Sequence, residues 1–172
     1  MKIKLTLIAA GLLTVGCATH SPETKTATTT LQPTKDNKVT GTVNFTQKGK
    51  HLTMVANVQG LAPGLHGFHI HEKGDCSAPD ATSAGGHFNP NNHAHGTSHV
   101  AGGHAGDMGN LTADAAGNAQ LTLELDGVEV STNSNGIVGR AVIVHAKPDD
   151  LTSQPVGNAG ARVACGVIAA SK

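Results

Sequence analysis

Apolar residues recur at every second position in several short segments of this 172-residue chain. In residues 52–59, Leu, Met, Ala and Val alternate with mostly polar neighbours, and residues 119–126 repeat the pattern with Ala and Leu. A period of two is typical of a strand with one buried face, whereas an amphipathic helix needs a period near 3.6. No segment shows a convincing helical period, so the sequence predicts an all-β fold.

Further segments of the same character follow one another along the chain. They are residues 39–45, 65–71, 137–145 and 162–169, with a weaker candidate at 27–34 that Pro33 interrupts. Turn-forming stretches rich in Gly and Asn, such as 115–118 and 133–136, separate the segments. Seven or eight short strands predict a β-sandwich or small barrel, and the chain is long enough for one such domain but not for two.

The composition narrows the classes of partner. Twelve Lys plus Arg balance twelve Asp plus Glu, so the basic excess that supports nucleic-acid binding is absent. Trp and Tyr are missing and Phe occurs three times, which leaves little for base stacking or an aromatic ligand pocket. We therefore expect no nucleic-acid partner and an aliphatic core.

The N-terminus has the character of a secretion signal. Lys2 and Lys4 precede an apolar run, residues 5–15, that is too short to span a bilayer as a helix. We therefore expect residues 1–16 to be removed on export. Their removal takes away two of the twelve basic residues, which leaves ten against twelve acidic ones and a formal charge of −2.

The signal ends in a segment, Leu13–Cys17, that resembles the lipobox of bacterial lipoproteins. This resemblance implies that Cys17 is lipidated and becomes the first mature residue, although Thr14 stands where Leu is usual. Cleavage after Ala18, with loss of Cys17, is the alternative. We expect a periplasmic protein held to a membrane only through a lipid on Cys17, with residues 17–26 as a tether and residues 27–172 as the folded domain.

Two cysteines remain in the predicted domain. Cys76 and Cys165 have no neighbouring cysteine with which to form a thiolate metal site, and an exported protein meets an oxidising environment. A Cys76–Cys165 disulfide is the simplest interpretation, with free buried thiols as the alternative.

Most of the histidines lie in or next to one segment whose apolar residues show no helical or strand period. Residues 72–106 form a stretch of 35 residues rich in Gly, His and Asn, with one cysteine and five histidines. A disulfide and a metal ion could supply the order that such a loop lacks. In the preceding predicted strand His69 and His71 are two residues apart and face the same side. His145 ends another predicted strand, and imidazole groups in such a cluster suit copper, zinc or iron.

Three segments carry a family resemblance. Residues 64–76 (GLHGFHIHEKGDC), 139–145 (GRAVIVH) and 157–168 (GNAGARVACGVI) resemble the copper/zinc superoxide dismutase family, in that family's order. The position of Cys76, directly after Gly74-Asp75, resembles the bacterial branch of this family. The resemblance implies a Greek-key β-sandwich or flattened barrel of about eight antiparallel strands. It also implies disproportionation of superoxide to oxygen and hydrogen peroxide by a redox-cycling copper beside a structural zinc.

The resemblance also implies two sets of metal ligands that share one histidine. The copper ligands would be His69, His71, His87 and His145. The zinc ligands would be His87, His95, His104 and Asp107.

Other residues take roles around these ligands if the resemblance holds. Asp149 would join a copper histidine to a zinc histidine, and Arg162 would attract and orient the superoxide anion. His87 would carry a proton to the departing peroxide. His66 has the wrong strand parity for a ligand and is expected to be a buried hydrogen-bonding residue, while His93 and His99 match no ligand position.

Two other classes of protein compete with the enzyme. A periplasmic copper- or zinc-binding or metal-delivery protein would need only the histidines and a loop. Such a protein has no use for Arg162 or for a coordination position on copper that is accessible to a small anion, whereas the enzyme needs both. A purely structural lipoprotein would leave the matching histidines unexplained. The resemblance is compatible with a homodimer.

Overall fold

The computed structural model describes residues 23–97 and 102–171, and within these ranges the chain is almost entirely strands and loops. The elements are β1 (Thr24–Pro33), β2 (Thr40–Lys48), β3 (His51–Gln59), β4 (Gly64–His71), η1 (Thr82–Ala84), β5 (Asp107–Ala113), β6 (Ala119–Leu125), β7 (Ala141–His145), β8 (Arg162–Val167) and β9 (Ala169–Ala170). The short 3-10 turn η1 is the one helical element in the described ranges. The predicted all-β fold is confirmed.

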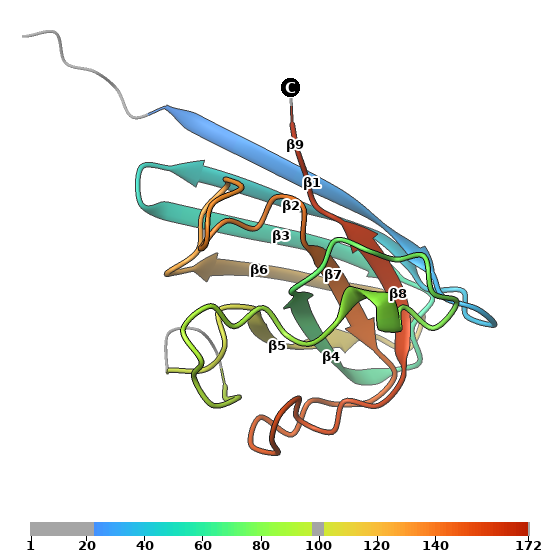
Figure 1. Cartoon of the computed structure of the whole chain (residues 1–172). Helices are drawn as coiled ribbons and strands as arrows, with labels where there is room; N and C mark the ends of the chain where they lie inside the picture. The colour runs from blue at the N-terminus through green and yellow to red at the C-terminus, as the bar shows by residue number, and fades with distance from the viewer. Residues whose placement is uncertain (1–22, 98–101, 172) are drawn as a thin grey trace, which may run out of the picture.

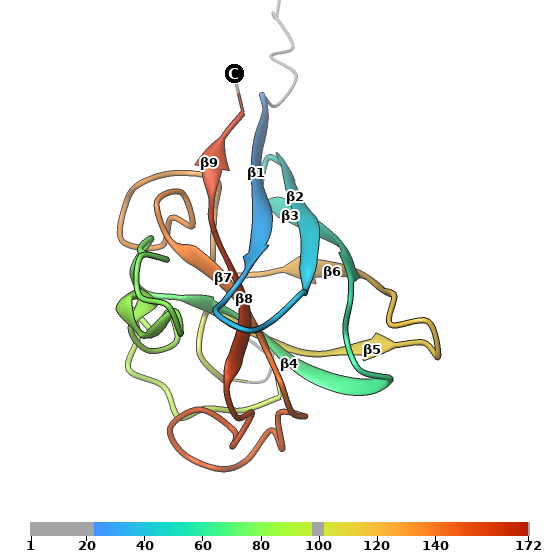
Figure 2. The same cartoon turned by 90° about the vertical axis from the view of Figure 1, so that its right-hand side faces the viewer.

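The strands form one antiparallel sheet that curls into a nearly closed barrel (Figures 1 and 2). Their order is β5-β4-β7-β8-β1-β2-β3-β6, and β9 pairs with β1. Four pairs of consecutive strands are not neighbours in the sheet: β3 and β4, β5 and β6, β6 and β7, and β8 and β9. The connections between them therefore cross from one part of the sheet to another. The predicted architecture of about eight antiparallel strands is therefore present.

Several strands differ from the expected ones. Where one strand was expected over 162–169, β8 ends at Val167 and a separate short strand, β9, follows. The weak candidate at 27–34 is a ten-residue strand, β1, which tolerates Pro33 because this residue is its last. It begins at Thr24, three residues before the expected domain start at residue 27. β5 was not predicted, because its apolar and polar residues alternate poorly and Gly109 interrupts it. In the structure Gly109 has a positive φ of 74°. β7 begins at Ala141 rather than at residue 137, after a turn at Gly139 with a φ of 83°.

The two central strands of the site are β4 and β7, and β7 and residues 66–71 of β4 are buried on both faces. Phe68 and Ile70 of β4 and Val142 and Val144 of β7 belong to the core inside the barrel. Ile143, on the opposite face of β7, packs in a second cluster with the loop that follows β4. Because fully burying an Ile or Phe side chain contributes about 1.5–3 kcal/mol, these strands are a firm support for the residues between the apolar ones.

A disulfide joins the loop after β4 to β8. Cys76 and Cys165 are bonded, with their Cα atoms 5.9 Å apart. The predicted pairing is confirmed, and it ties loop 72–106 to the outer face of the barrel beside Ala81, Ala84 and Ile143.

The predicted signal, the lipobox cysteine Cys17 and most of the tether lie outside the described residues. Within the described ranges, no helix has the length and apolar character needed to cross a membrane.

Candidate metal centre

Strand β4 places two histidines on the outer face of the barrel. His69 and His71 are fully buried and alternate with Phe68 and Ile70, which point into the core. The neighbouring strand β7 is in register with β4 and ends in His145. The period-two pattern therefore brings three imidazoles from two adjacent strands to one side of the sheet.

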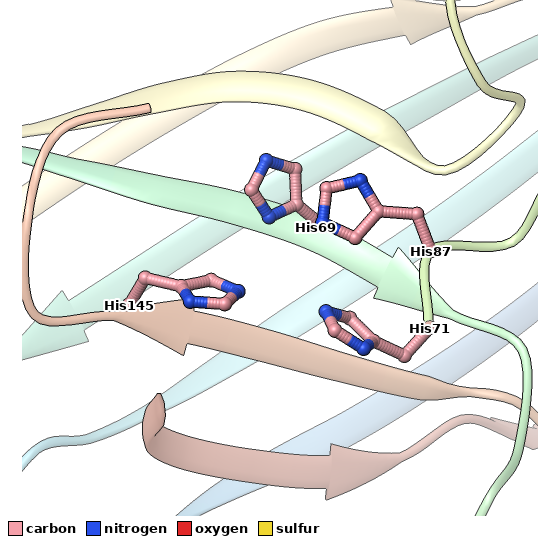
Figure 3. Close-up of side chains that lie close together, drawn as sticks. All are labelled: His69, His71, His87 and His145. Carbon is pink, nitrogen blue, oxygen red and sulfur yellow. The ribbon is translucent and has the colours of Figure 1, made fainter. Parts of the chain in front are cut away.

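His87 approaches the same place from loop 72–106. It forms an isolated antiparallel bridge with His71, which fixes the loop against the end of β4. One ring nitrogen from each of His69, His71, His87 and His145 lies within 4.8 Å of the others (Figure 3).

The ring nitrogens that face one another in this group have no hydrogen-bond partner. The opposite nitrogens of the three strand histidines are bonded: His69 Nε2–H donates to Asp149 (2.7 Å), His71 Nδ1–H to the Gly85 carbonyl (2.9 Å) and His145 Nδ1–H to the Gly160 carbonyl (3.1 Å). His69 Nδ1 and the Nε2 atoms of His71, His87 and His145 are buried without a partner. Four buried lone pairs directed at one point fit a metal ion with nitrogen ligands, such as copper.

A second group lies on the other side of the His87 ring. It consists of His87, His95, His104 and Asp107, again with ligand atoms within 4.8 Å of one another. Asp107 Oδ1 lies 2.8 Å from His87 Nδ1 and 3.4 Å from His104 Nδ1, and Asp107 Oδ2 lies 3.1 Å from His95 Nδ1. Three imidazole nitrogens and one carboxylate in a closed site fit tetrahedral zinc.

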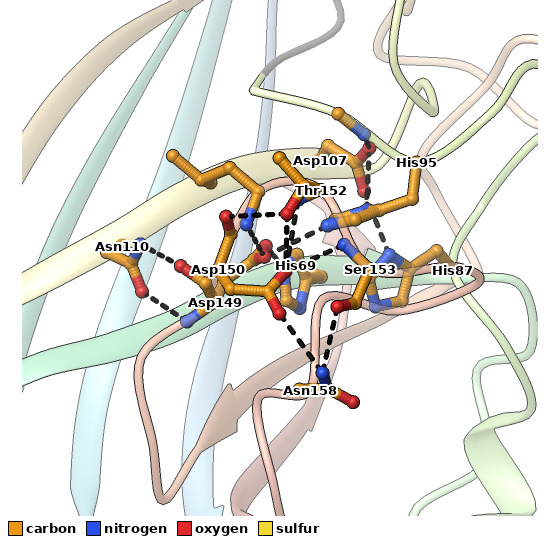
Figure 4. A network of polar contacts seen from close by, with 12 residues as sticks. His69, His87, His95, Asp107, Asn110, Asp149, Asp150, Thr152, Ser153 and Asn158 are labelled. Atoms are coloured by element: carbon orange, nitrogen blue, oxygen red, sulfur yellow. Dashed lines mark hydrogen bonds and ion pairs between the residues drawn. The ribbon is translucent and has the colours of Figure 1, made fainter.

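Asp149 connects the two groups. Its Oδ2 accepts from His69 Nε2 at 2.7 Å and its Oδ1 accepts from His95 Nε2 at 2.9 Å (Figure 4). The carboxylate therefore sets which nitrogen of each ring carries the proton, and it leaves Nδ1 of both rings free for a metal.

Burial keeps the imidazoles of the three strand histidines neutral by lowering their pKa values. It lowers the pKa of His69 to about 4 and that of His145 to about 3, and it lowers the pKa of His71 well below its ordinary value. Burial would raise the pKa of Asp107, but hydrogen bonds from His87 and from the His104 N–H outweigh it and lower this pKa to about 2. At neutral pH His69, His71 and His145 are therefore neutral imidazoles and Asp107 is a carboxylate, which are the protonation states that bind metals.

Arg162 lies beside the first group. Its guanidinium donates to the carbonyls of Ala81 and Gly85, both at 2.6 Å, and the Gly85 carbonyl also accepts from His71. Two bonds to one loop fix the direction of the cation, and its positive charge contributes to lowering the pKa of His71.

His66 and His93 belong to neither group. His66 is buried with its ring nitrogens 2.8 Å from the carbonyl oxygens of His145 and Ala62. His93 is exposed, with Nδ1 3.2 Å from the Gly103 carbonyl, and His99 lies outside the described residues.

Sequence reasoning missed two polar residues that support the site. Asn110 pairs with the backbone of Asp149, and Gln154 pairs with the backbone of His95. The sequence signal for Asn110 and Gln154 is weak, because single Asn and Gln residues are common in loops and strands and these two belong to none of the three family-like segments.

Comparison with known proteins identifies the class of protein. Residues 39–168 match the family model described as copper/zinc superoxide dismutase, and this range contains every residue of both groups. The chain belongs to the copper/zinc superoxide dismutase family, whose members disproportionate superoxide and use copper and zinc as cofactors. Among its relatives is an extracellular superoxide dismutase [Cu-Zn] of Brugia pahangi, 42% identical over 158 residues that cover 86% of this chain and 78% of that protein.

Proposed function

We propose that copper is held by His69, His71, His87 and His145. The observation that carries this assignment is the set of four buried ring nitrogens, each without a hydrogen-bond partner, that point at one another. Leaving such atoms unpaired costs about 1–3 kcal/mol each, and a metal ion would remove that cost.

We propose that zinc is held by His87, His95, His104 and Asp107. Two imidazole nitrogens that lie close together support this proposal. His87 Nδ1 lies 3.3 Å from His104 Nδ1, and both nitrogens lie beside the Asp107 carboxylate. His87 would then serve both metals, with Nε2 toward copper and Nδ1 toward zinc.

Arg162 would attract and orient the substrate. Superoxide is an anion, and a guanidinium held in place by two carbonyls can attract it without reorganising. Copper, when bound, supplies the one-electron chemistry by which one superoxide is oxidised to oxygen and another is reduced. With two protons, two superoxide anions thus give one oxygen and one hydrogen peroxide.

His87 would supply one of these protons. Its Nε2 faces the copper group and its Nδ1 faces Asp107, so the ring can take up a proton at Nε2 and still be oriented from the other side. It would deliver this proton to the departing peroxide, which is general acid catalysis by a positioned imidazole.

The Arg162→Gln variant tests the enzymatic role against mere metal storage. We expect kcat/KM for superoxide to fall roughly tenfold, because electrostatic attraction of a charged substrate is lost. Copper and zinc content should stay as in the wild type, since Arg162 is not in either ligand group. Unchanged kcat/KM in a fully metal-loaded variant would contradict the role of Arg162.

We also propose export and lipid anchoring. The relative from Brugia pahangi is named an extracellular enzyme, which supports secretion. The finer proposal is a periplasmic lipoprotein with a signal over residues 1–16, a lipid on Cys17, a tether over 17–26 and the enzyme domain over 27–172. Mass spectrometry of the mature N-terminus tests it: Cys17→Ser should abolish lipid attachment, and a lipid-free wild-type protein that begins at Thr19 would refute it. A homodimer is a further proposal, tested by the molar mass of the mature chain in solution.

A further inference from the structure

The side chain of Gln154 forms hydrogen bonds with both the N–H and the carbonyl of His95. The His95 N–H donates to Gln154 Oε1 at 2.8 Å, and the His95 carbonyl accepts from Gln154 Nε2 at 2.9 Å. Among the described residues, no other hydrogen bond reaches the His95 backbone. The amide of Gln154 therefore acts on His95 as a neighbouring strand would.

The same loop holds the ring of His95. Loop 146–161, between β7 and β8, carries both Gln154 and Asp149, and Asp149 Oδ1 accepts from His95 Nε2 at 2.9 Å. His95 is thus attached to one loop at two points, its backbone and its ring. With both fixed, the direction of His95 Nδ1 toward Asp107, 3.1 Å away, is fixed as well.

Loop 146–161 is itself anchored where it carries Asp149. Asn110 of β5 accepts from the Asp149 N–H at 2.8 Å and donates to the Asp149 carbonyl at 2.9 Å (Figure 4). The loop also packs closely at Gly157, where an added Cβ would lie 1.8 Å from Asp149 Oδ1 and 2.6 Å from His95 Nε2. The attachment of Gln154 to His95 therefore starts from a rigid support.

We propose that Gln154 is a positioning residue for the zinc group: it ties loop 146–161 to the backbone of His95 and so sets the direction in which His95 meets the metal. This inference rests on the assignment of His95 to zinc made above. Groups that orient a metal ligand typically change metal affinity by 10–100-fold when they are removed. Gln154 acts through two neutral hydrogen bonds, so we expect an effect near the lower end of that range.

The test compares Gln154→Met with Gln120→Met in the full-length mature protein. Methionine has a similar length to glutamine but makes neither bond, and Gln120 is an exposed residue of β6 that serves as a matched control. We expect Gln154→Met to weaken zinc binding roughly tenfold in competition with a chelator and to speed hydrogen exchange of the His95 amide. Copper affinity and the unfolding midpoint of the metal-free protein should match those of the control. Gln154→Glu, which keeps only the acceptor for the His95 N–H, should lie between wild type and Gln154→Met.

Two results would overturn the proposal. One is zinc affinity in Gln154→Met equal to that in Gln120→Met. The other is an equal loss of copper and zinc with a lower metal-free midpoint, which would indicate general destabilisation. A parallel His95→Ala variant separates the two levels of inference: if it keeps its zinc, the ligand assignment itself fails, whereas zinc loss there with normal zinc in Gln154→Met refutes only the role of Gln154.

Discussion

The two ligand groups are supported by different kinds of structure. Three of the four residues in the proposed copper group, His69, His71 and His145, lie on strands whose alternate side chains fill the barrel core. In the proposed zinc group, by contrast, His95 and His104 lie in a loop without regular structure. The three strand histidines of the proposed copper group are therefore placed by the fold. In the proposed zinc group only Asp107, the first residue of β5, lies on a strand, whereas His95 and His104 depend on hydrogen bonds and on the metal itself.

The comparison also explains the place of His87. It comes from the loop, but its bridge to His71 attaches it to the end of β4. It is the one residue shared by both groups, so it couples a rigid site to a less rigid one.

The largest expected effect follows from removing a strand ligand. His145→Ala or His71→Ala should lose copper and reduce dismutation to less than a few per cent, while the disulfide-linked barrel stays folded. The fold survives because the neighbouring residues of β4 and β7 keep their packing. Metal content, turnover and circular dichroism measure this, with the exposed His51→Ala as control. Substantial turnover without His145 would reject the copper assignment.

Removing the Asp107 carboxylate from the proposed zinc group should disorder the loop, unlike the removal of a strand histidine. Asp107→Ala deletes a proposed zinc ligand and also the acceptor for the N–H groups of His104 (2.8 Å) and Gly96 (3.2 Å). We expect zinc loss and rapid proteolytic cleavage within loop 72–106, because metal binding and loop order are coupled. The control is Asp126→Ala, an exposed aspartate after β6. If the loop of Asp107→Ala resists protease as the wild type does, zinc is not its main anchor.

The buried copper-group histidines should make the metal-free protein sensitive to acid. The folded-state pKa is about 4 for His69 and about 3 for His145, whereas the ordinary value is 6.5. Between pH 6.5 and about 4 the unfolded chain therefore binds more protons than the folded one, so stability falls as the pH falls. We expect a loss of roughly 1–3 kcal/mol per pH unit from these two groups in denaturant unfolding. A flat profile over this window would contradict the neutral, buried state of the two imidazoles.

The smallest effect is expected for the loop histidines outside both groups. His93→Ala with His99→Ala should keep one zinc per chain and near-normal turnover, whereas His95→Ala alone should lose zinc. His93 is exposed and bonded only to neighbouring loop groups, in contrast to the buried His95. Zinc stoichiometry decides this, and the opposite pattern would show that the loop ligands are assigned to the wrong histidines.

The strand part of the site was predictable from sequence because strand geometry is local. A period of two places His69 and His71 on one face whatever the rest of the fold does. The sequence could not show that His69 presents Nδ1 while His71 presents Nε2. That difference arises because Asp149, 80 residues away, takes Nε2 of His69.

The loop part was predictable only through the family resemblance. His93 and His95 have the same spacing as His69 and His71, and no periodicity in the loop distinguishes them. Their difference comes from tertiary contacts with Asp149 and Gln154, which are distant in sequence. β5 escaped prediction for a related reason, since pairing with β4 stabilises it despite Gly109 and a shift in register opposite Gly67.

The central claim is that one histidine is shared by two metals, one in a site built mainly by strands and one in a site built mainly by a loop. Anomalous diffraction from crystals of the metal-loaded protein, collected at the copper and zinc edges, tests it most directly. We predict a copper peak about 2 Å from His87 Nε2, with His69, His71 and His145 around it, and a zinc peak about 2 Å from His87 Nδ1 beside Asp107. A single peak, or a zinc peak that contacts neither His87 nor Asp107, would contradict the claim.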